Sequence, residues 1–358
     1  MERKLPGQDY SITTGTAATA AALAALLSLE GPVETVNIKT PLGNLPIAVK
    51  CSRKLGPDSA QAVVVKMPYH DPDVTQNIEI FAHITLVSDP GVYIKGGDGI
   101  GTVTKPGLQV EEGEAAINPV PREMIKSNLE SHLPTDKGVE VIISAPNGQE
   151  IAKRTLNSRM GIVGGISILG TTGIARSMSL ESYKTSFKCQ IDVAWAQGYR
   201  ELVFVPGNIG EILAKKILTY DPDQIIQMGN FVGYMLKEAE KAGVKKIILF
   251  GHSGKLIKIA AGIFNTKHAI ADGRREVITS HMGRLGVNKA LINRVFNSTT
   301  TEEMTSILEE NNLSFAVFNK IASSIKERCR ERFNMEFEAV IVKMDGTVLN
   351  SNHSVKII

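Results

Sequence analysis

The second half of the chain alternates short apolar runs with amphipathic segments, and this alternation constrains the fold more than any other feature. Four apolar runs of strand length precede segments of helical periodicity: Ile162–Leu169, Leu202–Val205, Ile225–Met228 and Lys246–Phe250. Strands that alternate with helices build parallel sheets, because each crossover back to a parallel neighbour usually contains a helix. The sequence therefore predicts a Rossmann-like, doubly wound parallel-sheet domain over residues 159–358.

The first half lacks this regularity and predicts a different domain. Hydroxyl side chains at residues 11–16 can cap a buried, Ala-rich helix that runs to Leu29, and several strand-like runs follow it, including Ile78–Val87. Turn signals at Asp89-Pro90-Gly91 and Pro146-Asn147-Gly148 predict hairpins. This pattern is typical of an antiparallel α+β domain, over residues 1–158. A chain of 358 residues is long enough for two hydrophobic cores.

Composition excludes several partners. The 40 basic and 37 acidic residues leave a net charge of only +3, and aromatic residues make up 5% of the chain, so we expect no nucleic-acid binding. The apolar run Ala17–Leu29 is too short to span a bilayer, so we expect no membrane association. Three widely spaced cysteines favour a reducing, cytoplasmic compartment. No histidine, cysteine or carboxylate spacing predicts a metal site. A homo-oligomer is compatible with these data.

Four glycine-bearing loops follow the four predicted strands. They are Gly170–Gly173, Pro206–Gly210, Gly229-Asn230 and Gly251–Lys255. Ligands of a doubly wound sheet bind at the carboxyl ends of its strands, where helix N-terminal amides face anionic groups. A single such glycine indicates only a tight turn, whereas four in succession favour a ligand site. Leu256 replaces the hydroxyl of a phosphate loop, and no G-x-G-x-x-G pattern supports ordinary NAD binding.

Several polar residues lie beside these loops or in turns. Asp73 follows a proline in an acidic turn, where it can cap the turn or move a proton. His252 has the same two alternatives, capping its loop or transferring a proton. Cations near glycine- or proline-rich segments can receive carboxylates; they are Lys105, Arg122, Arg176 and Lys255.

Longer motifs resemble the cobalt-precorrin-5B C(1)-methyltransferase family, CbiD, over nearly the whole chain. They begin with Thr13-Thr14-Gly15-Thr16 and Asp71-Pro72-Asp73-Val74-Thr75. The others are Gly99-Ile100-Gly101-Thr102-Val103-Thr104-Lys105-Pro106-Gly107-Leu108, Ile117-Asn118-Pro119-Val120-Pro121-Arg122, Gly165–Ile174, Gly251–Lys258, Asn265-Thr266 and Ala271-Asp272-Gly273-Arg274. Ordered matches of this length are specific. The chain departs from the family pattern at Ala17, Tyr69-His70 and Lys267-His268, so no essential role is assigned there.

The resemblance implies methyl transfer from S-adenosylmethionine, a co-substrate, to ring carbon C-1 of a cobalt-containing tetrapyrrole. Cobalt would arrive with the substrate. On this reading the donor site is formed by Gly170, Thr171, Thr172, Gly173, Gly207, Asn208 and Gly210. The four cations named above would hold the carboxylate arms of the macrocycle, and the glycine-rich segment 96–105 would cover its ring. The candidates for proton transfer are Asp73, Asp98 and His252. A nicotinamide-dependent reductase of the same pathway and a non-catalytic tetrapyrrole carrier remain alternatives.

Overall fold

The computed structural model describes residues 10–69, 73–176, 180–351 and 354–357. The chain forms two units, Met1–Tyr183 and Lys184–Ile358, each of mixed α/β structure. Residues 159–176, which the sequence analysis assigned to the second domain, belong to the first unit. The reason is their strand pairing: β10 (Ile162–Val163) pairs with β8 (Thr102–Val103), and β11 (Ile174–Arg176) pairs with β1 (Tyr10–Ile12).

The first unit contains a five-stranded sheet. Its order is β4-β5-β6-β9-β7, and all neighbours are antiparallel except β9 and β7. The predicted hairpin at Asp89-Pro90-Gly91 is wrong, because β9 lies between the two strands that this turn connects. The strands are β4 (Cys51–Lys54), β5 (Ser59–Val65), β6 (Glu79–Val87), β7 (Val92–Gly96) and β9 (Gly138–Ser144).

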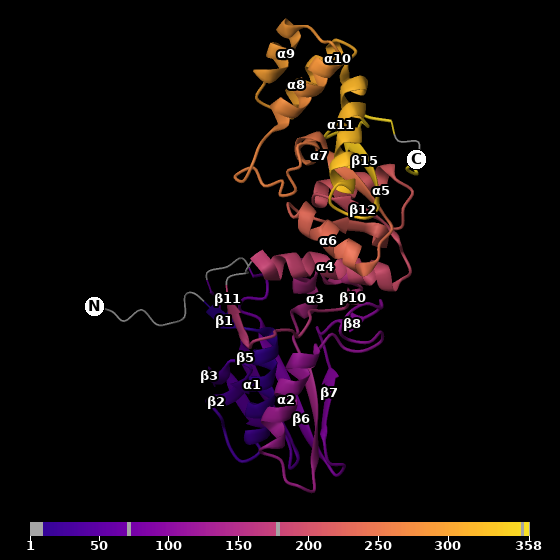
Figure 1. The fold of residues 1–358 in the computed structure, drawn as a ribbon. Coiled ribbons are helices and arrows are strands. Elements are labelled where there is room, and N and C mark those ends of the chain that lie inside the picture. The colour runs from indigo at the N-terminus through magenta and orange to yellow at the C-terminus, as the bar shows by residue number, and fades with distance from the viewer. Residues whose placement is uncertain (1–9, 70–72, 177–179, 352–353, 358) are drawn as a thin grey trace, which may run out of the picture. The chain divides into compact units, whose positions relative to one another are not determined.

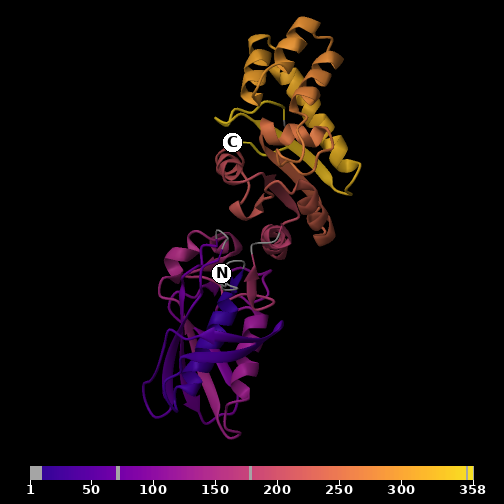
Figure 2. The ribbon, with the colours of Figure 1, turned by 90° about the vertical axis from the view of Figure 1, so that its left-hand side faces the viewer.

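A buried helix organises this unit. Helix α1 (Thr14–Leu27) is capped by Thr13, whose side chain accepts from Thr16 N, as its hydroxyl-rich start predicts. Every residue from Thr14 to Leu26 is buried. Alanine and glycine let the helix lie close to β5, β6 and helix α2 (Pro119–Glu130), as Figures 1 and 2 show. The hairpin of β2 (Thr35–Thr40) and β3 (Gly43–Ala48) adjoins it.

The glycine-rich segment 96–101 is a packing junction within the first unit. Gly99 has a φ of +73°, and a Cβ added there would lie 1.8 Å from the carbonyl oxygen of Ala145. A Cβ on Gly148 or Gly165 would lie 2.1 Å from the carbonyl oxygen of Gly99.

The predicted hairpin at Pro146-Asn147-Gly148 is also wrong, since helix α3 (Gly148–Ala152) begins there and a 3₁₀ helix, η1 (Asn157–Met160), follows.

The second unit contains a four-stranded parallel sheet in the order β13-β12-β14-β15. Three of its strands confirm the sequence-based prediction: β12 (Glu201–Val205), β13 (Ile225–Gln227) and β14 (Lys246–His252). The fourth is not Ile162–Leu169, which lies in the first unit, but β15 (Glu336–Val342). A 3₁₀ helix, η2 (Pro222–Gln224), precedes β13.

Helices cover both faces of this sheet. Helix α5 (Asn208–Ile217) packs on side chains of one face, among them Val203, Val205 and Phe250. The alternate side chains, such as Phe204 and Leu249, face four helices: α4 (Leu180–Ala196), α6 (Val232–Ala242), α7 (Ser253–Ala260) and α11 (Ser314–Arg330). Helices α8 (Arg274–Arg284), α9 (Lys289–Phe296) and α10 (Thr301–Glu310) extend the second group along α11 (Figure 1). Among the described residues, no helix has the length and apolar character that crossing a membrane requires.

Candidate functional site

Three of the four glycine-bearing loops lie at the carboxyl edge of the parallel sheet. The chain passes from β12 to β13 on one side and then to β14 on the other, so the strand order reverses between β12 and β14. Such a reversal is where α/β sheets open a crevice for ligands. The two flanking loops approach closely, since a Cβ on Gly251 would lie 2.7 Å from Pro206 Cδ.

The loop after β12 combines a fixed polar network with open space. Gln227 Nε2 donates to Asn208 Oδ1 across 2.8 Å and to Glu211 Oε2 across 2.7 Å, which ties the end of β13 to the start of α5. Gly207, the N-cap residue of α5, has extended backbone, and a Cβ there would meet no atom within 4 Å beyond its chain neighbours. No contact of the described residues therefore requires glycine at this position.

The Gly170–Gly173 loop, by contrast, lies in the first unit, so its predicted place at the carboxyl edge is wrong. It packs against the N-terminus of α1: Gly15 N donates to Leu169 O across 3.0 Å, and Thr13 N donates to Gly173 O across 3.2 Å. Gly170 has a φ of +141°, and its Cβ would lie 2.4 Å from Thr13 Oγ1. Packing accounts for Gly170 and Gly173, while Thr171 and Thr172 are exposed.

Asp73 is surrounded by donors in the first unit. Its carboxylate pairs with Lys66, whose side chain is 2% exposed, and accepts from Tyr69 Oη at 3.1 Å. It also accepts from Thr75 N at 2.8 Å and Thr75 Oγ1 at 2.6 Å. Burial raises the pKa of Asp73, but the hydrogen bonds from Lys66 and Thr75 outweigh it and leave the pKa below its ordinary value. This geometry supports the turn-capping interpretation.

Arg122 also satisfies its donors within the protein. Its Nε donates to Ile117 O across 2.9 Å, and its terminal nitrogens lie 3.4 Å from the carbonyl oxygens of Ile94 and Ala115. A weaker contact of 3.5 Å reaches Glu114. The guanidinium thus joins the start of α2 to β7 and its following loop, a role that competes with carboxylate binding.

The remaining candidates of the first unit are Asp98, Lys105 and Arg176. Asp98 is exposed at the glycine junction, and its carbonyl oxygen accepts from Ala145 N at 2.8 Å. The stem of Lys105 lies over Gly161, where a Cβ would come within 2.4 Å of Lys105 Cγ. The Arg176 side chain lies outside the described residues, so its predicted role stays a prediction.

His252 caps helix α7 in the second unit. Its Nδ1 accepts from Gly254 N at 3.1 Å, and its Nε2 lies 2.6 Å from Glu302 Oε1. Both ring nitrogens therefore have protein partners. The structure favours the loop-capping alternative over proton transfer.

A group of cations that the sequence analysis did not combine lies beside this loop. Lys255 Nζ donates to Asn230 Oδ1 across 2.7 Å, and Lys258, one turn further along α7, reaches the chain before α8. That chain carries Asp272, which forms a two-contact ion pair with Arg274, the first residue of α8. In the sequence these residues belong to separate motifs, Gly251–Lys258 and Ala271-Asp272-Gly273-Arg274, and nothing local shows that the motifs meet.

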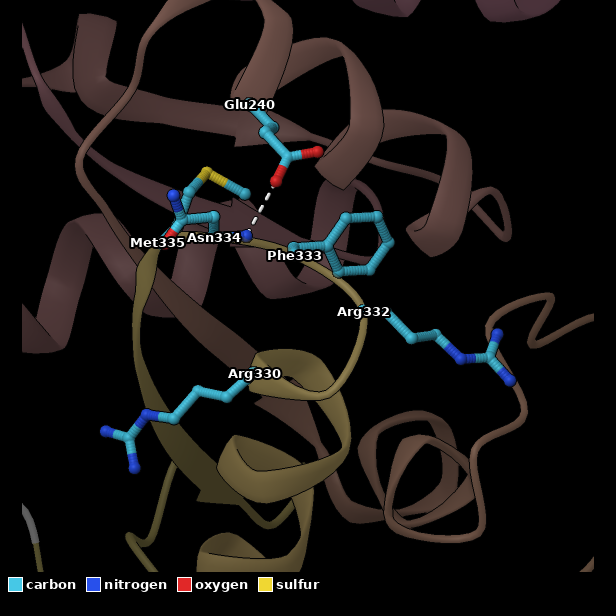
Figure 3. Close-up of a pocket in the computed structure, with 6 residues that line it drawn as sticks. All are labelled: Glu240, Arg330, Arg332, Phe333, Asn334 and Met335. Atoms are coloured by element: carbon cyan, nitrogen blue, oxygen red, sulfur yellow. Dashed lines mark hydrogen bonds between the residues drawn. The ribbon is translucent and has the colours of Figure 1, made fainter.

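The hollow in Figure 3 is not part of this edge. It has a volume of about 400 Å³ and is lined by Glu240, Arg330, Arg332, Phe333, Asn334 and Met335. Glu240 Oε1 accepts from Asn334 N across 2.6 Å, and Arg332 stacks 4.5 Å from the Phe264 ring centroid. Five of the six lining residues lie between Arg330 and Met335, just before β15, which places the hollow at the amino edge of the sheet. Among the described residues, no cluster of three His, Cys, Asp or Glu side chains can hold a metal ion.

These features define the chain as a protein with mixed α/β structure in each of its two units. Residues 1–177 match the family model described as CbiD, and residues 265–353 match that of the CbiD C-terminal domain. The chain belongs to the CbiD family, which confirms the resemblance seen in the sequence.

Curated relatives match almost end to end. A protein of Methanosphaera stadtmanae is 52% identical over 97% of this chain and 92% of its own length. One of Methanobrevibacter smithii is 52% identical over 97% and 98%, respectively. Both are named cobalt-precorrin-5B C(1)-methyltransferase. A crystal structure of the cobalamin biosynthesis protein cbiD from Archaeoglobus fulgidus is 29% identical and covers 74% of this chain and 84% of that one, with a TM-score of 0.39.

Proposed function

We propose that this chain transfers the methyl group of S-adenosylmethionine to ring carbon C-1 of cobalt-precorrin-5B, giving cobalt-precorrin-6A. The observation that carries the proposal is the end-to-end similarity to relatives that bear this activity in their names. In the transfer, the C–S bond of the sulfonium breaks and its electrons stay on sulfur, while the ring carbon supplies the pair for the new C–C bond. Cobalt is bound by the substrate and not by the protein.

The protein's contribution to such a reaction is mainly placement. A sulfonium methyl needs no covalent intermediate, so holding the ring carbon in line with it can supply most of the acceleration. We assign the donor to the carboxyl edge of the second unit, which we take to be Rossmann-like, at Gly207, Asn208 and Gly210. The open space beside Gly207 supports this assignment.

The test is a methyl-transfer assay with the full chain. Cobalt-precorrin-5B and ¹³C-methyl S-adenosylmethionine should give a product heavier by one labelled methyl, located at C-1 by NMR. Consumption of NADPH without methyl incorporation would instead support a reductase. Tight binding of the tetrapyrrole without affinity for the donor would support a carrier. Either result would refute the proposal.

A further inference from the structure

Two lysines of helix α7 donate to oxygen atoms of neighbouring loop segments. Lys255 Nζ lies 2.7 Å from Asn230 Oδ1, and Thr266 Oγ1 lies 3.3 Å from the same oxygen. Lys258 Nζ donates to Ala271 O at 2.8 Å and to Thr266 O at 3.3 Å. The stretch from Thr266 to Ala271 is therefore held against α7 and against the loop that follows β13.

Among the described residues, no carboxylate lies within hydrogen-bonding distance of the buried lysine, Lys258. The side chain of Lys258 is 2% exposed, and its acceptors in the described structure are carbonyl oxygens. Burial lowers the pKa of Lys258; Asp272 opposes this, and Arg274 and Lys255 add to it. A buried ammonium held only by neutral dipoles leaves a positive potential around it.

Arg274 brings a third cation to the group. Its Nε and one terminal nitrogen contact Asp272 at 2.7 Å and 2.6 Å, and its side chain is 24% exposed. Burial and the nearby Arg274 charge lower the pKa of Lys255. Among the described residues, Lys255, Lys258 and Arg274 thus lie near a single carboxylate, that of Asp272, which leaves an excess of about two positive charges. The other terminal nitrogen of Arg274 supplies further N–H donors of the planar fork that suits carboxylates.

We propose that Lys255 and Arg274 form a binding site for a carboxylate of a small molecule, with Lys258 as the positioning residue that fixes the loop between them. A carboxylate would offset the excess charge and accept the free donors of both side chains. This inference rests on the proposed function, whose two substrates both carry such a group. One source is the amino-acid end of the methyl donor, and the other is an acetate or propionate arm of the tetrapyrrole.

The experiment measures binding by the full chain with two matched pairs of probes. S-adenosylhomocysteine carries the amino-acid carboxylate, and 5′-methylthioadenosine lacks it. Cobyrinic acid carries free carboxylate arms, and cobinamide has them amidated. The variants are Arg274→Gln and Lys255→Gln. The matched control is Arg275→Gln, since Arg275 is the exposed neighbour of Arg274 in the first turn of α8. Thermal unfolding checks that each variant folds.

The expected result is a loss of about ten- to hundredfold in affinity for one carboxylate probe, as when a hydrogen bond to a charged group is removed. The partner probe without the carboxylate should bind the variants and the wild type equally, and Arg275→Gln should bind like the wild type. The pair whose carboxylate probe binds the variants more weakly shows whether the carboxylate belongs to the methyl donor or to the tetrapyrrole. Unchanged carboxylate binding in both variants would overturn the site, as would equal losses for both members of a pair. The site would also be overturned if the wild type bound the two probes of each pair with equal affinity. If methyl transfer occurs nonetheless, the proposed function stands without this site.

Discussion

His252 and Glu302 are joined by a hydrogen bond of 2.6 Å between Nε2 and Oε1. On the other side of the ring, Nδ1 accepts from the backbone N–H of Gly254, which can only donate. Nδ1 is therefore unprotonated and Nε2 carries the proton. The imidazole anchors the start of α7 to α10 and has no free nitrogen for a substrate while both bonds persist.

Replacing His252 separates the capping role from a catalytic one. Asparagine is a good N-cap residue, so His252→Asn should keep methyl transfer within about threefold of the wild type. His252→Ala removes the cap and should lower the free energy of unfolding by about 1 kcal/mol. Steady-state rates and urea unfolding measure the two effects. A loss of about a hundredfold or more in a well-folded His252→Asn would show instead that the ring moves a proton.

Two glycines should respond to alanine in opposite ways. Gly207 has extended backbone and open space at its Cβ, so Gly207→Ala should change the free energy of unfolding by less than about 1 kcal/mol. If the donor lies there, affinity for S-adenosylhomocysteine should fall about tenfold, because the new methyl occupies ligand space. Gly170→Ala is the contrasting change. Its φ of +141° and the contact with Thr13 predict a loss of about 2 kcal/mol or more.

Calorimetry measures the stability of both glycine variants against unfolding. Titration with S-adenosylhomocysteine measures their affinity for this ligand. Donor binding by Gly207→Ala at wild-type strength would place the donor away from the start of α5. An unchanged stability of Gly170→Ala would contradict the packing account of the loop in the first unit.

Asp73 should matter to stability through Lys66. Asp73→Asn keeps an acceptor for Thr75 N but leaves the ammonium of Lys66 buried without its counter-charge, which should cost about 3 kcal/mol. Asp58→Asn is the control, because its pair with Lys137 is exposed and should contribute less than about 1 kcal/mol. Urea unfolding compares the two.

The pH dependence of this pair has a definite sign. The folded state holds the pKa of Asp73 below its ordinary value, so the stabilisation is complete above the unfolded pKa of about 3.9. It is lost as pH falls below that value toward the folded pKa. Wild-type stability should therefore drop between about pH 4 and pH 3, and Asp73→Asn should drop less. If the free energies of unfolding of the wild type and Asp73→Asn fell equally over this pH range, the ion pair of Asp73 with Lys66 would be refuted.

The sequence predicted the second unit better than the first because its signals are local. Strands β12 and β14 follow from the short apolar runs Leu202–Val205 and Lys246–Phe250. Of the predicted strand Ile162–Leu169, only Ile162–Val163 forms a regular strand, and Ile166 and Ile168 make isolated bridges to Ile100 and Ile117 of the first unit. Strand β15 takes the fourth place in the sheet, and no local pattern reveals its partner.

For the candidate site, too, the sequence predicted the positions of loops but not the partners of side chains that folding brings together. The loops after β12 and β14 were located correctly because strand ends are visible in sequence. The roles of Asp73 and Arg122 depend on Lys66 and on carbonyl groups of Ile94 and Ile117, which folding brings together. The motifs identified the family correctly while several of their polar residues maintain the fold.

His281 should make the stability of the second unit depend on pH near neutrality. Its side chain is 6% exposed, and its Nε2 lies 3.4 Å from Ser324 Oγ. Its Nδ1 is buried and accepts or donates no hydrogen bond within the described part of the chain. Burial, followed by the charges of Arg284 and Lys320, lowers the pKa of His281. The neutral ring therefore contributes stability that is complete above the unfolded pKa of about 6.5 and is lost as pH falls below it.

Trp195, the single tryptophan of the chain, lies in the second unit and reports its unfolding in urea. Between pH 7.5 and 5.5 the free energy of unfolding should decrease by at most about 1.4 kcal/mol per pH unit, the limit for one proton. His281→Gln should flatten this dependence, because glutamine does not titrate. His268→Gln, which alters an exposed histidine of the same unit, should keep it. If His281→Gln retained the full slope, another group would have to bind the proton on unfolding, and burial of the neutral imidazole would not explain the acid sensitivity.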